Sequence, residues 1–315
     1  MKYYLGIDVG GTFVKGALVS EKGDILNKGK IPTDSKIGGE KIIRDIAAFC
    51  EDLTASYGIK LSDVEGIGMG IPGIVDGESG VIIYVPNLNW RNFEGAKLLS
   101  SLTGLPVKLS NDANAAALGE TKFGAGKKYK STVMLTLGTG VGGGVIIDGK
   151  LFEGNKGAGT ELGHMVIVSG GEECNCGRRG CLEAYASATA LIRDTRRAMK
   201  KNPDSKLWQI GSLDKVDGKL AFDYYDTDES AREVVDNYIE KLATGIVDFA
   251  NIFRPEAIII GGGVCAQGEN LRAPLEKILE KELYAGDVGP KVDLLIAELK
   301  NDAGSLGAAA LVLNN

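Results

Sequence analysis

The pattern of apolar and polar positions predicts two similar β-units along the 315-residue chain. In the first, strands at Tyr3–Ile7 and Phe13–Ser20 flank a glycine turn at Asp8–Thr12, and the turn Glu21–Asp24 leads into a strand at Ile25–Lys30. In the second, strands at Thr132–Leu137 and Val145–Ile147 flank the glycine run Gly138–Gly144, before a turn at Asp148–Gly149. Because one core rarely serves a chain of this length, we expect two related lobes with a ligand cleft between them.

The rest of the chain alternates helical and strand patterns and becomes mostly helical towards its end. The further expected elements are a helix at Gly39–Tyr57, strands at Val64–Gly70 and Pro106–Ser110, a loop at Ile71–Gly73, helices at Ala113–Phe123 and Glu229–Phe253, a buried strand at Ala257–Ile260, a turn at Gly261–Gly263, a helix after Asn270, a strand at Val292–Ala297 and a closing helix from about Ala303. Residues 201–226 are polar and poorly patterned, which predicts a surface excursion.

The charge of the chain limits the kinds of molecule that it is expected to bind. The 36 basic and 42 acidic residues give a net charge of −6 without a basic block, so a general nucleic-acid or membrane-surface binder is not indicated. The N-terminus lacks the apolar core of a signal peptide, and no apolar run reaches the ~20 residues of a membrane span. We expect a cytoplasmic protein without nucleic-acid or membrane partners.

The glycine loops predict phosphate binding. Strand pattern follows Gly10 and Gly11, whereas a dinucleotide-binding G-x-G-x-x-G turn opens a helix, and no G-x-x-x-x-G-K-[ST] string is present. The remaining candidates are two loops in which a glycine turn joins two strands. Backbone N–H groups in such loops can form an anion nest. Thr12 and Thr139 add hydroxyl donors, and Asp8 is suited to hold Mg²⁺ through water. The alternative for either loop alone is a tight hairpin.

Three cysteines lie close to the single histidine. Cys174, Cys176 and Cys181 follow His164, and one nitrogen with three thiolates completes a closed, structural zinc site. Free thiols are the alternative. Cys50 and Cys265 lie in apolar stretches and are expected to be buried small hydrophobes.

Leu5–Thr12 and Gly138–Gly144 resemble the phosphate elements of the sugar kinase, heat-shock ATPase and actin superfamily, and within it the chain resembles the ROK family of sugar kinases and repressors. The resemblance implies an α/β, two-lobed, actin-like ATPase (ribonuclease H-like) fold with a duplicated mixed-sheet core. We expect a small lobe of residues 1–113 and 301–315 and a large lobe of residues 114–300. The expected nucleotide-binding residues are Asp8, Gly10, Gly11, Thr12, Lys15, Gly138, Thr139, Gly140, Gly262 and Gly263, with the small-residue helix 303–308 also bordering the adenosine or, alternatively, packing on another helix.

The resemblance also assigns the acceptor site. Asp112, in the string Ser-Asn-Asp-Ala, would be the catalytic base, although from the sequence alone it is equally suited to cap a helix. The family's zinc signature implies that His164 binds the metal with one ring nitrogen and the sugar with the other. The expected sugar-binding residues are Gly73, Asn87, Asn111, Asp112, Glu161, His164 and Glu183, of which the two glutamates are alternatively solvated carboxylates.

These assignments predict an ATP-dependent hexokinase that uses Mg·ATP, contains a structural zinc and forms a homodimer. Glucose leads as the acceptor because Glu161–Glu183 and Pro86–Leu88 look most like the glucokinase branch, with fructose, mannose, N-acetylglucosamine and N-acetylmannosamine as alternatives. A sugar-responsive transcription regulator is the alternative from another class, disfavoured because a strand beginning at Tyr3 leaves no room for a DNA-binding segment before it. G-x-S-x-G and H-E-x-x-H strings are absent, and a glycosidase would leave both phosphate loops unexplained.

Overall fold

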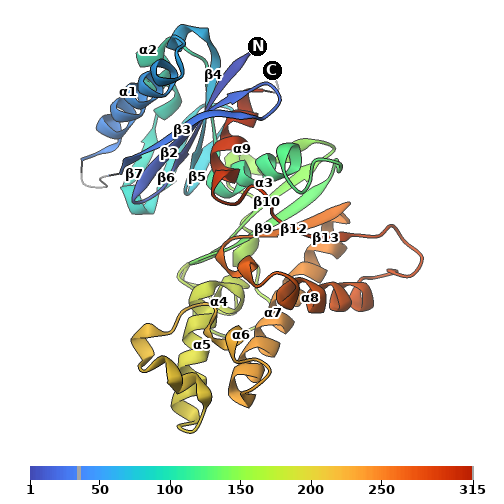
Figure 1. Ribbon diagram of the computed structural model, residues 1–315. Helices are drawn as coiled ribbons and strands as arrows, with labels where there is room; N and C mark the ends of the chain where they lie inside the picture. The colour runs from blue at the N-terminus through green and yellow to red at the C-terminus, as the bar shows by residue number, and fades with distance from the viewer. Residues whose placement is uncertain (34–36, 314–315) are drawn as a thin grey trace. The chain divides into compact units, whose positions relative to one another are not determined.

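The computed structural model describes residues 1–33 and 37–313, which form two compact units (Figure 1). Unit 1 comprises Met1–Lys130, Gly144–Thr160 and Glu298–Asn315, and unit 2 comprises Ser131–Gly143 and Glu161–Ala297. The expected lobe boundaries, after residue 113 and before residue 301, remain a prediction, and positions 314–315 of the small lobe lie outside the described residues. No helix in the described part of the chain is long and apolar enough to cross a membrane.

The first sheet of unit 1 has the strand order β3-β2-β1-β4-β8. Its strands are β1 (Tyr3–Val9), β2 (Phe13–Ser20), β3 (Ile25–Pro32), β4 (Val64–Ile71) and β8 (Val107–Asn111). β1 pairs antiparallel with β2 and parallel with β4, so the predicted meander is confirmed and the sheet is mixed. The parallel edge ends at Asn111, next to the predicted base.

Helices cover both faces of this sheet, and successive side chains of a strand point to opposite faces. On one face, Leu5 and Ile7 of β1 join a core with α1 (Gly39–Tyr57) and α2 (Gly95–Thr103). On the other, Tyr4 joins a core with α9 (Ala303–Val312), which packs against α3 (Asp112–Phe123). A small antiparallel sheet of β5 (Ile74–Asp76), β6 (Val81–Val85) and β7 (Trp90–Phe93) completes these layers.

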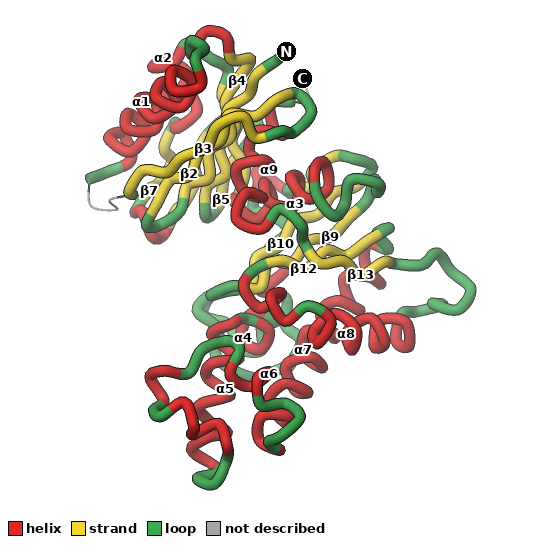
Figure 2. Tube along the Cα trace, in the orientation of Figure 1, coloured by secondary structure: helices red, strands yellow, loops and turns green. Residues whose placement is uncertain are grey.

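The second large sheet repeats the plan of the first, with the order β11-β10-β9-β12-β13 (Figure 2). Its strands are β9 (Thr132–Leu137), β10 (Val141–Ile147), β11 (Lys150–Phe152), β12 (Ala257–Gly261) and β13 (Asp293–Ile296). β10 pairs antiparallel with β11, and β12 runs parallel to both β9 and β13. The predicted duplication of a mixed sheet is therefore confirmed.

The helices of unit 2 follow the second glycine loop and the cysteine cluster. They are α4 (Glu183–Ala186), α5 (Ala188–Lys201), α6 (Leu220–Asp223), α7 (Glu229–Phe253) and α8 (Glu269–Glu282). Residues 201–226 were expected to be a surface excursion, and most of them are exposed or half-buried, but the segment also carries buried apolar residues. Leu207, Val216 and Leu220 are buried and share a core with Met199 and Ala231, because three single-turn helices bring scattered apolar residues to one side.

The extent of the second glycine loop also differs from the prediction. The loop spans only residues 138–140, and strand β10 already begins at Val141. Gly143 and Gly144 lie within the strand, where an added Cβ would fall 2.6 Å from Leu162 and 2.5 Å from Ala117 respectively. These glycines therefore serve close packing, which a glycine run in the sequence does not distinguish from a loop.

Candidate active site and metal centre

The first glycine loop joins β1 to β2 and carries Asp8 and Lys15 beside it. Asp8 and Lys15 are register partners on the two strands, and the Lys15 Nζ lies 3.8 Å from the Asp8 Oδ2. The Gly10 N–H donates to the Phe13 carbonyl over 3.0 Å, which closes the turn. Within the described residues, the N–H groups of Gly11 and Thr12 donate to no protein acceptor.

The second glycine loop repeats this donor pattern. The Gly138 N–H donates to the Gly140 carbonyl over 3.0 Å, while the N–H groups of Thr139 and Gly140 have no protein acceptor in the part of the chain that the structure describes. In both loops the first glycine closes the turn and the next two amides are available to an anion, which is the arrangement of a nest. Thr12 and Thr139 lie at these positions, as the sequence predicts.

Asp112 is the first residue of α3, and Asn111 is the helix cap. The Asn111 Oδ1 accepts the N–H of Ala113 over 2.9 Å and of Asn114 over 3.3 Å. The idea that Asp112 serves as the N-cap is therefore wrong, because the preceding side chain already fills that role. One Asp112 oxygen, Oδ1, accepts the Ala113 N–H over 2.9 Å, which fixes the carboxylate at the end of β8.

The electrostatics of unit 1 set Asp8 and Asp112 apart from ordinary carboxylates. Burial raises the pKa of both side chains, and two backbone hydrogen bonds partly offset this for Asp112. The charge of Asp112 also raises the pKa of Asp8, while Lys15 lowers it. A bound cation would reduce the repulsion between these two partly buried carboxylates. The residues therefore fit a magnesium ion bound together with substrate phosphates.

Gly73 is linked directly to Asn111, whereas Asn87 is not. The Asn111 Nδ2 donates to the Gly73 carbonyl over 3.0 Å. Gly73 has a φ of 107°, and a side chain there would run into the Tyr84 carbonyl. Asn87 is exposed in the turn Pro86–Leu88 between β6 and β7, and no described contact joins it to Asp112.

His164 and the three neighbouring cysteines converge in unit 2. Their ligand atoms all lie within 4.8 Å of one another. The Cys176 and Cys181 Sγ atoms are 3.7 Å apart, and the His164 Nδ1 lies 3.6 Å from the Cys174 Sγ. A tetrahedron with zinc–sulfur bonds of about 2.3 Å and a zinc–nitrogen bond of about 2.0 Å has edges of about 3.8 Å and 3.5 Å. The cluster therefore fits a four-coordinate metal, and the cysteines form no disulfide.

The thiols of this cluster differ in their surroundings. Burial raises the pKa of Cys174 to about 12, and burial also raises the pKa of Cys181. The backbone N–H of Arg178 lowers the pKa of Cys176, the exposed member of the set. A metal ion that binds here displaces the thiol protons, as for other thiolate sites.

Glu161 and Glu183 lie on either side of the cysteine cluster. Glu161 is exposed and is the residue before the short helix Leu162–His164. Glu183 begins α4, and its Oε2 accepts the Val141 N–H over 3.0 Å, while the Cys174 Sγ lies 3.5 Å from its Oε1. Glu183 is therefore not a solvated carboxylate, and it connects the cluster to the start of β10.

The glycines expected near the adenosine occupy two different settings. Gly262 has a φ of 92° and contacts the Leu137 backbone closely, whereas an added Cβ at Gly263 would meet nothing within 4 Å. In the small-residue helix α9, Gly307 allows close packing on the Ala115 carbonyl of α3, and Gly304 lies against the Asp8 carboxylate. The packing alternative holds for Gly307, and the adenosine contacts remain a prediction.

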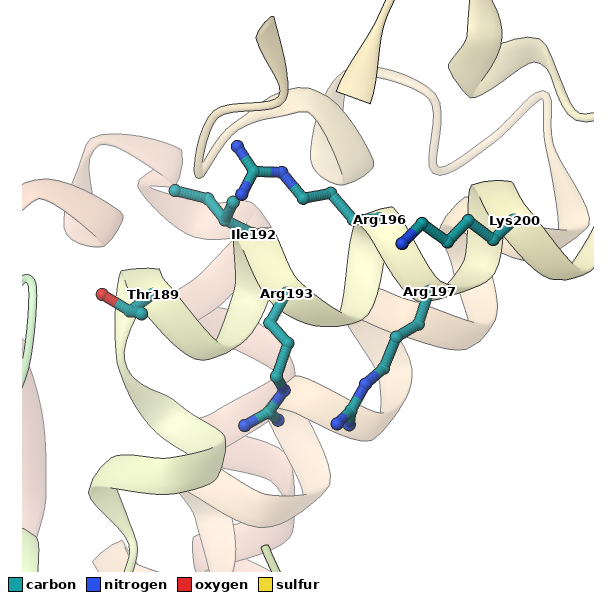
Figure 3. A pocket seen from close by; sticks show the side chains of 6 residues that line it. All are labelled: Thr189, Ile192, Arg193, Arg196, Arg197 and Lys200. Atoms are coloured by element: carbon teal, nitrogen blue, oxygen red, sulfur yellow. The ribbon is translucent and has the colours of Figure 1, made fainter. Parts of the chain in front are cut away.

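A groove on α5 was missed by the sequence analysis. Figure 3 shows its lining residues, which all belong to this helix: Thr189, Ile192, Arg193, Arg196, Arg197 and Lys200. The groove has a volume of about 460 Å³. Arg193 and Arg197 form ion pairs with Glu172 and Asp194, which reduce its positive charge. Helical spacing of the cations in residues 188–201 could have indicated this face.

Comparison with known proteins identifies the family of this chain. The family model described as "ROK family" matches residues 4–315. The chain belongs to the ROK family. A curated glucokinase from Thermotoga maritima is 41% identical over 314 residues, which cover 98% of this chain and 96% of the relative. A solved ROK family glucokinase from Streptomyces griseus, in complex with glucose and AMPPNP, superposes with a TM-score of 0.80 at 36% identity and covers 98% of both chains.

ROK proteins with another role also match. A xylose repressor from Caldicellulosiruptor bescii is 30% identical over 314 residues, which cover 99% of this chain and 78% of the repressor. Membership of the family therefore does not by itself distinguish a kinase from a regulator. The predicted fold class, an actin-like α/β ATPase with mixed sheets, is confirmed by the ROK structures.

Proposed function

We propose that this ROK protein is an ATP-dependent sugar kinase that phosphorylates glucose to glucose 6-phosphate. Its full-length similarity to glucokinases supports the substrate assignment. One observation of the structure carries the reaction type. Asp112 is relieved of helix capping by Asn111 and has a raised pKa, so its carboxylate is available as a base at a fixed position.

In the proposed reaction, Asp112 accepts the proton of the sugar hydroxyl. The hydroxyl oxygen forms a bond to the γ-phosphorus of ATP as the bond from that phosphorus to the β,γ-bridging oxygen breaks, and ADP leaves. Gly11, Thr12, Thr139 and Gly140 offer backbone N–H groups to the phosphate oxygens. Because such donors are already oriented, they stabilise developing negative charge without reorganisation.

Magnesium and the nucleotide complete the proposed donor site. Mg²⁺ neutralises charge on the phosphates when it is bound, and Asp8 would hold it through water. Lys15, held 3.8 Å from Asp8, would add a cation beside the phosphates. Gly10 and Gly138 would shape the turns of the two loops, and Gly262 and Gly263 would border the adenosine.

The cysteine cluster is proposed to hold a structural zinc ion. His164, Cys174, Cys176 and Cys181 would supply a closed set of four ligands. The second ring nitrogen of His164, with Glu161 and Glu183, would then bind sugar hydroxyls. Gly73, Asn87 and Asn111 would line the same sugar site, and Asn111 is linked to Gly73 by its amide.

We place the enzyme in the cytoplasm, as a homodimer that closes on sugar and Mg·ATP. Fructose, mannose and the N-acetylhexosamines are alternative acceptors, since selection depends on a few atoms of the pocket. A sugar-responsive regulator is the second candidate, because a xylose repressor also matches 99% of this chain.

Analysis of the reaction products tests the proposal. The purified protein is incubated with Mg·ATP and glucose, and phosphorus NMR follows the loss of the γ-phosphate and the appearance of a sugar phosphate. Glucose 6-phosphate formed together with ADP supports the kinase. Sugar binding without any phosphorylated product, combined with binding to operator-type DNA, supports the regulator instead.

A further inference from the structure

A short segment fixes the second glycine loop from one side. Residues 182–189 begin directly after Cys181 and include α4 and the first residues of α5. The Ser187 hydroxyl caps α5 by accepting the Ala190 N–H over 3.1 Å. The cap therefore fixes the start of α5, beside the residues that contact the loop.

Hydrogen bonds join this segment to the loop and to the first residue after it. The Ala188 N–H donates to the Gly138 carbonyl over 2.8 Å, and the Thr189 Oγ1 donates to the Thr139 carbonyl over 2.7 Å. Glu183 accepts the Val141 N–H over 3.0 Å at the far end of the loop. These contacts involve two loop carbonyls and the amide after the loop, and they leave the N–H groups of Thr139 and Gly140 without a protein acceptor within the described ranges.

The segment is also held independently of the loop. The buried Tyr238 hydroxyl of α7 donates to the Ala186 carbonyl over 2.8 Å. The buried Leu182 side chain packs against Gly245 of the same helix, where an added Cβ would lie 2.7 Å away. Residues 182–189 are therefore held by contacts with the long helix α7, and the loop is hydrogen-bonded to these residues.

Of the residues that make these contacts, Thr189 uses an exposed side chain. Figure 3 shows its hydroxyl directed away from Arg193 and Arg197 of the same helix. A threonine hydroxyl in the middle of a helix can donate to the carbonyl one turn earlier, as Thr244 does to the Glu240 carbonyl over 2.9 Å. Thr189 is the second residue of α5 and has no earlier turn of its own helix to bond. Thr189 instead bonds a residue fifty positions away, in the loop.

We propose that Thr189 is a positioning residue for nucleotide binding, which acts through the Thr139 carbonyl to hold the second glycine loop in its phosphate-binding form. This inference rests on the proposed function, because it requires that the loop binds the phosphates of ATP. In a trans peptide the carbonyl and the N–H of the next residue point to opposite sides, so the bond from Thr189 to the Thr139 carbonyl directs the Gly140 N–H away from α5. Loss of the hydroxyl therefore weakens nucleotide binding without removing any group that touches the sugar.

The test compares Thr189→Val, which removes the hydroxyl and keeps the shape, with Thr189→Ser, which keeps the hydroxyl. AMPPNP affinity is measured by calorimetry with magnesium present, and steady-state kinetics give KM for ATP and for glucose separately. Because Thr189→Val loses one hydrogen bond, its AMPPNP affinity is expected to be about fivefold weaker than that of the wild type. Thr189→Ser is expected to restore the wild-type value, and KM for glucose is expected not to change in either variant.

Thr244→Val is the matched control, since it removes a hydroxyl that donates to a carbonyl of its own helix. Equal AMPPNP affinity in Thr189→Val and wild type would overturn the inference, and so would a Thr189→Ser variant as weak as Thr189→Val. An equal loss in Thr244→Val would also contradict it. Failure of the proposed function is seen separately, in a wild-type protein that binds no AMPPNP before any variant is compared.

Discussion

Asn111 caps helix α3 with its side-chain oxygen, and this leaves Asp112 as the first helical residue beside it. The division of roles between the two neighbours matters because a capping carboxylate is occupied by backbone N–H groups. Asp112 accepts the adjacent Ala113 N–H through its Oδ1. The proposed catalytic chemistry depends on this arrangement.

Replacement of the proposed base tests it directly. Asp112→Asn is expected to lower kcat by about 10²- to 10⁴-fold, because the amide cannot accept the hydroxyl proton. Glucose affinity, measured by calorimetry, is expected to remain close to that of the wild type. Asp287→Asn, at an exposed turn, is the matched control for loss of one carboxylate. Turnover retained in Asp112→Asn would show that another group takes the proton.

The pH dependence of the reaction should report the same carboxylate. Burial raises the pKa of Asp112, and the side chain must be ionised to act as a base. kcat/KM is therefore expected to increase with pH through an acid limb that lies above about 3.9, the ordinary value for aspartate. Steady-state rates with glucose from mildly acidic to neutral pH measure this limb. A limb at or below the ordinary value would contradict the proposed environment of Asp112.

Capping by Asn111 predicts a stability effect that is separate from catalysis. Asn111→Ala removes the acceptor for two amides of α3 and is expected to lower the free energy of unfolding by about 1 kcal/mol. Asn111→Ser retains a capping oxygen and is expected to lose less. Urea unfolding followed by circular dichroism gives both values. Equal losses in the two variants would indicate that the bond to the Gly73 carbonyl, and not the cap, stabilises this site.

The metal centre predicts a stoichiometry. The wild-type protein should contain about one zinc ion per chain, and Cys176→Ser should contain clearly less, because it removes one of four ligands. The variant should also unfold at a lower temperature and bind glucose more weakly. Cys50→Ala changes a fully buried thiol in α1 and serves as the control. Metal analysis of the three proteins decides the matter, and an unchanged zinc content in Cys176→Ser would contradict the ligand set.

Much of the fold could be predicted because the apolar pattern was strong. β2, α1 and α7 have the predicted bounds, since each carries a clear period and ends at a glycine, a turn or a proline. Glycine was less informative, because Gly144 in a strand and Gly138 in a loop look alike in the sequence. A residue without a side chain gives no sign of which face is buried.

The site could be predicted only as a set of local motifs. His164 and its cysteines were found by their spacing, and the structure brings their ligand atoms together. The assignment of the cap to Asn111 could not be decided from two adjacent capping residues. The bond between Thr189 and Thr139 joins positions fifty residues apart, and only the packing of α5 brings them together.

The central claim is phosphoryl transfer from ATP to glucose. The most direct measurement is ADP release from Mg·ATP with a panel of hexoses and N-acetylhexosamines, each compared with a blank that lacks sugar. We predict that glucose stimulates ADP release far above the blank and more strongly than the other sugars. ADP release that stays at the blank level with every sugar, in a protein that still binds glucose, would contradict the account.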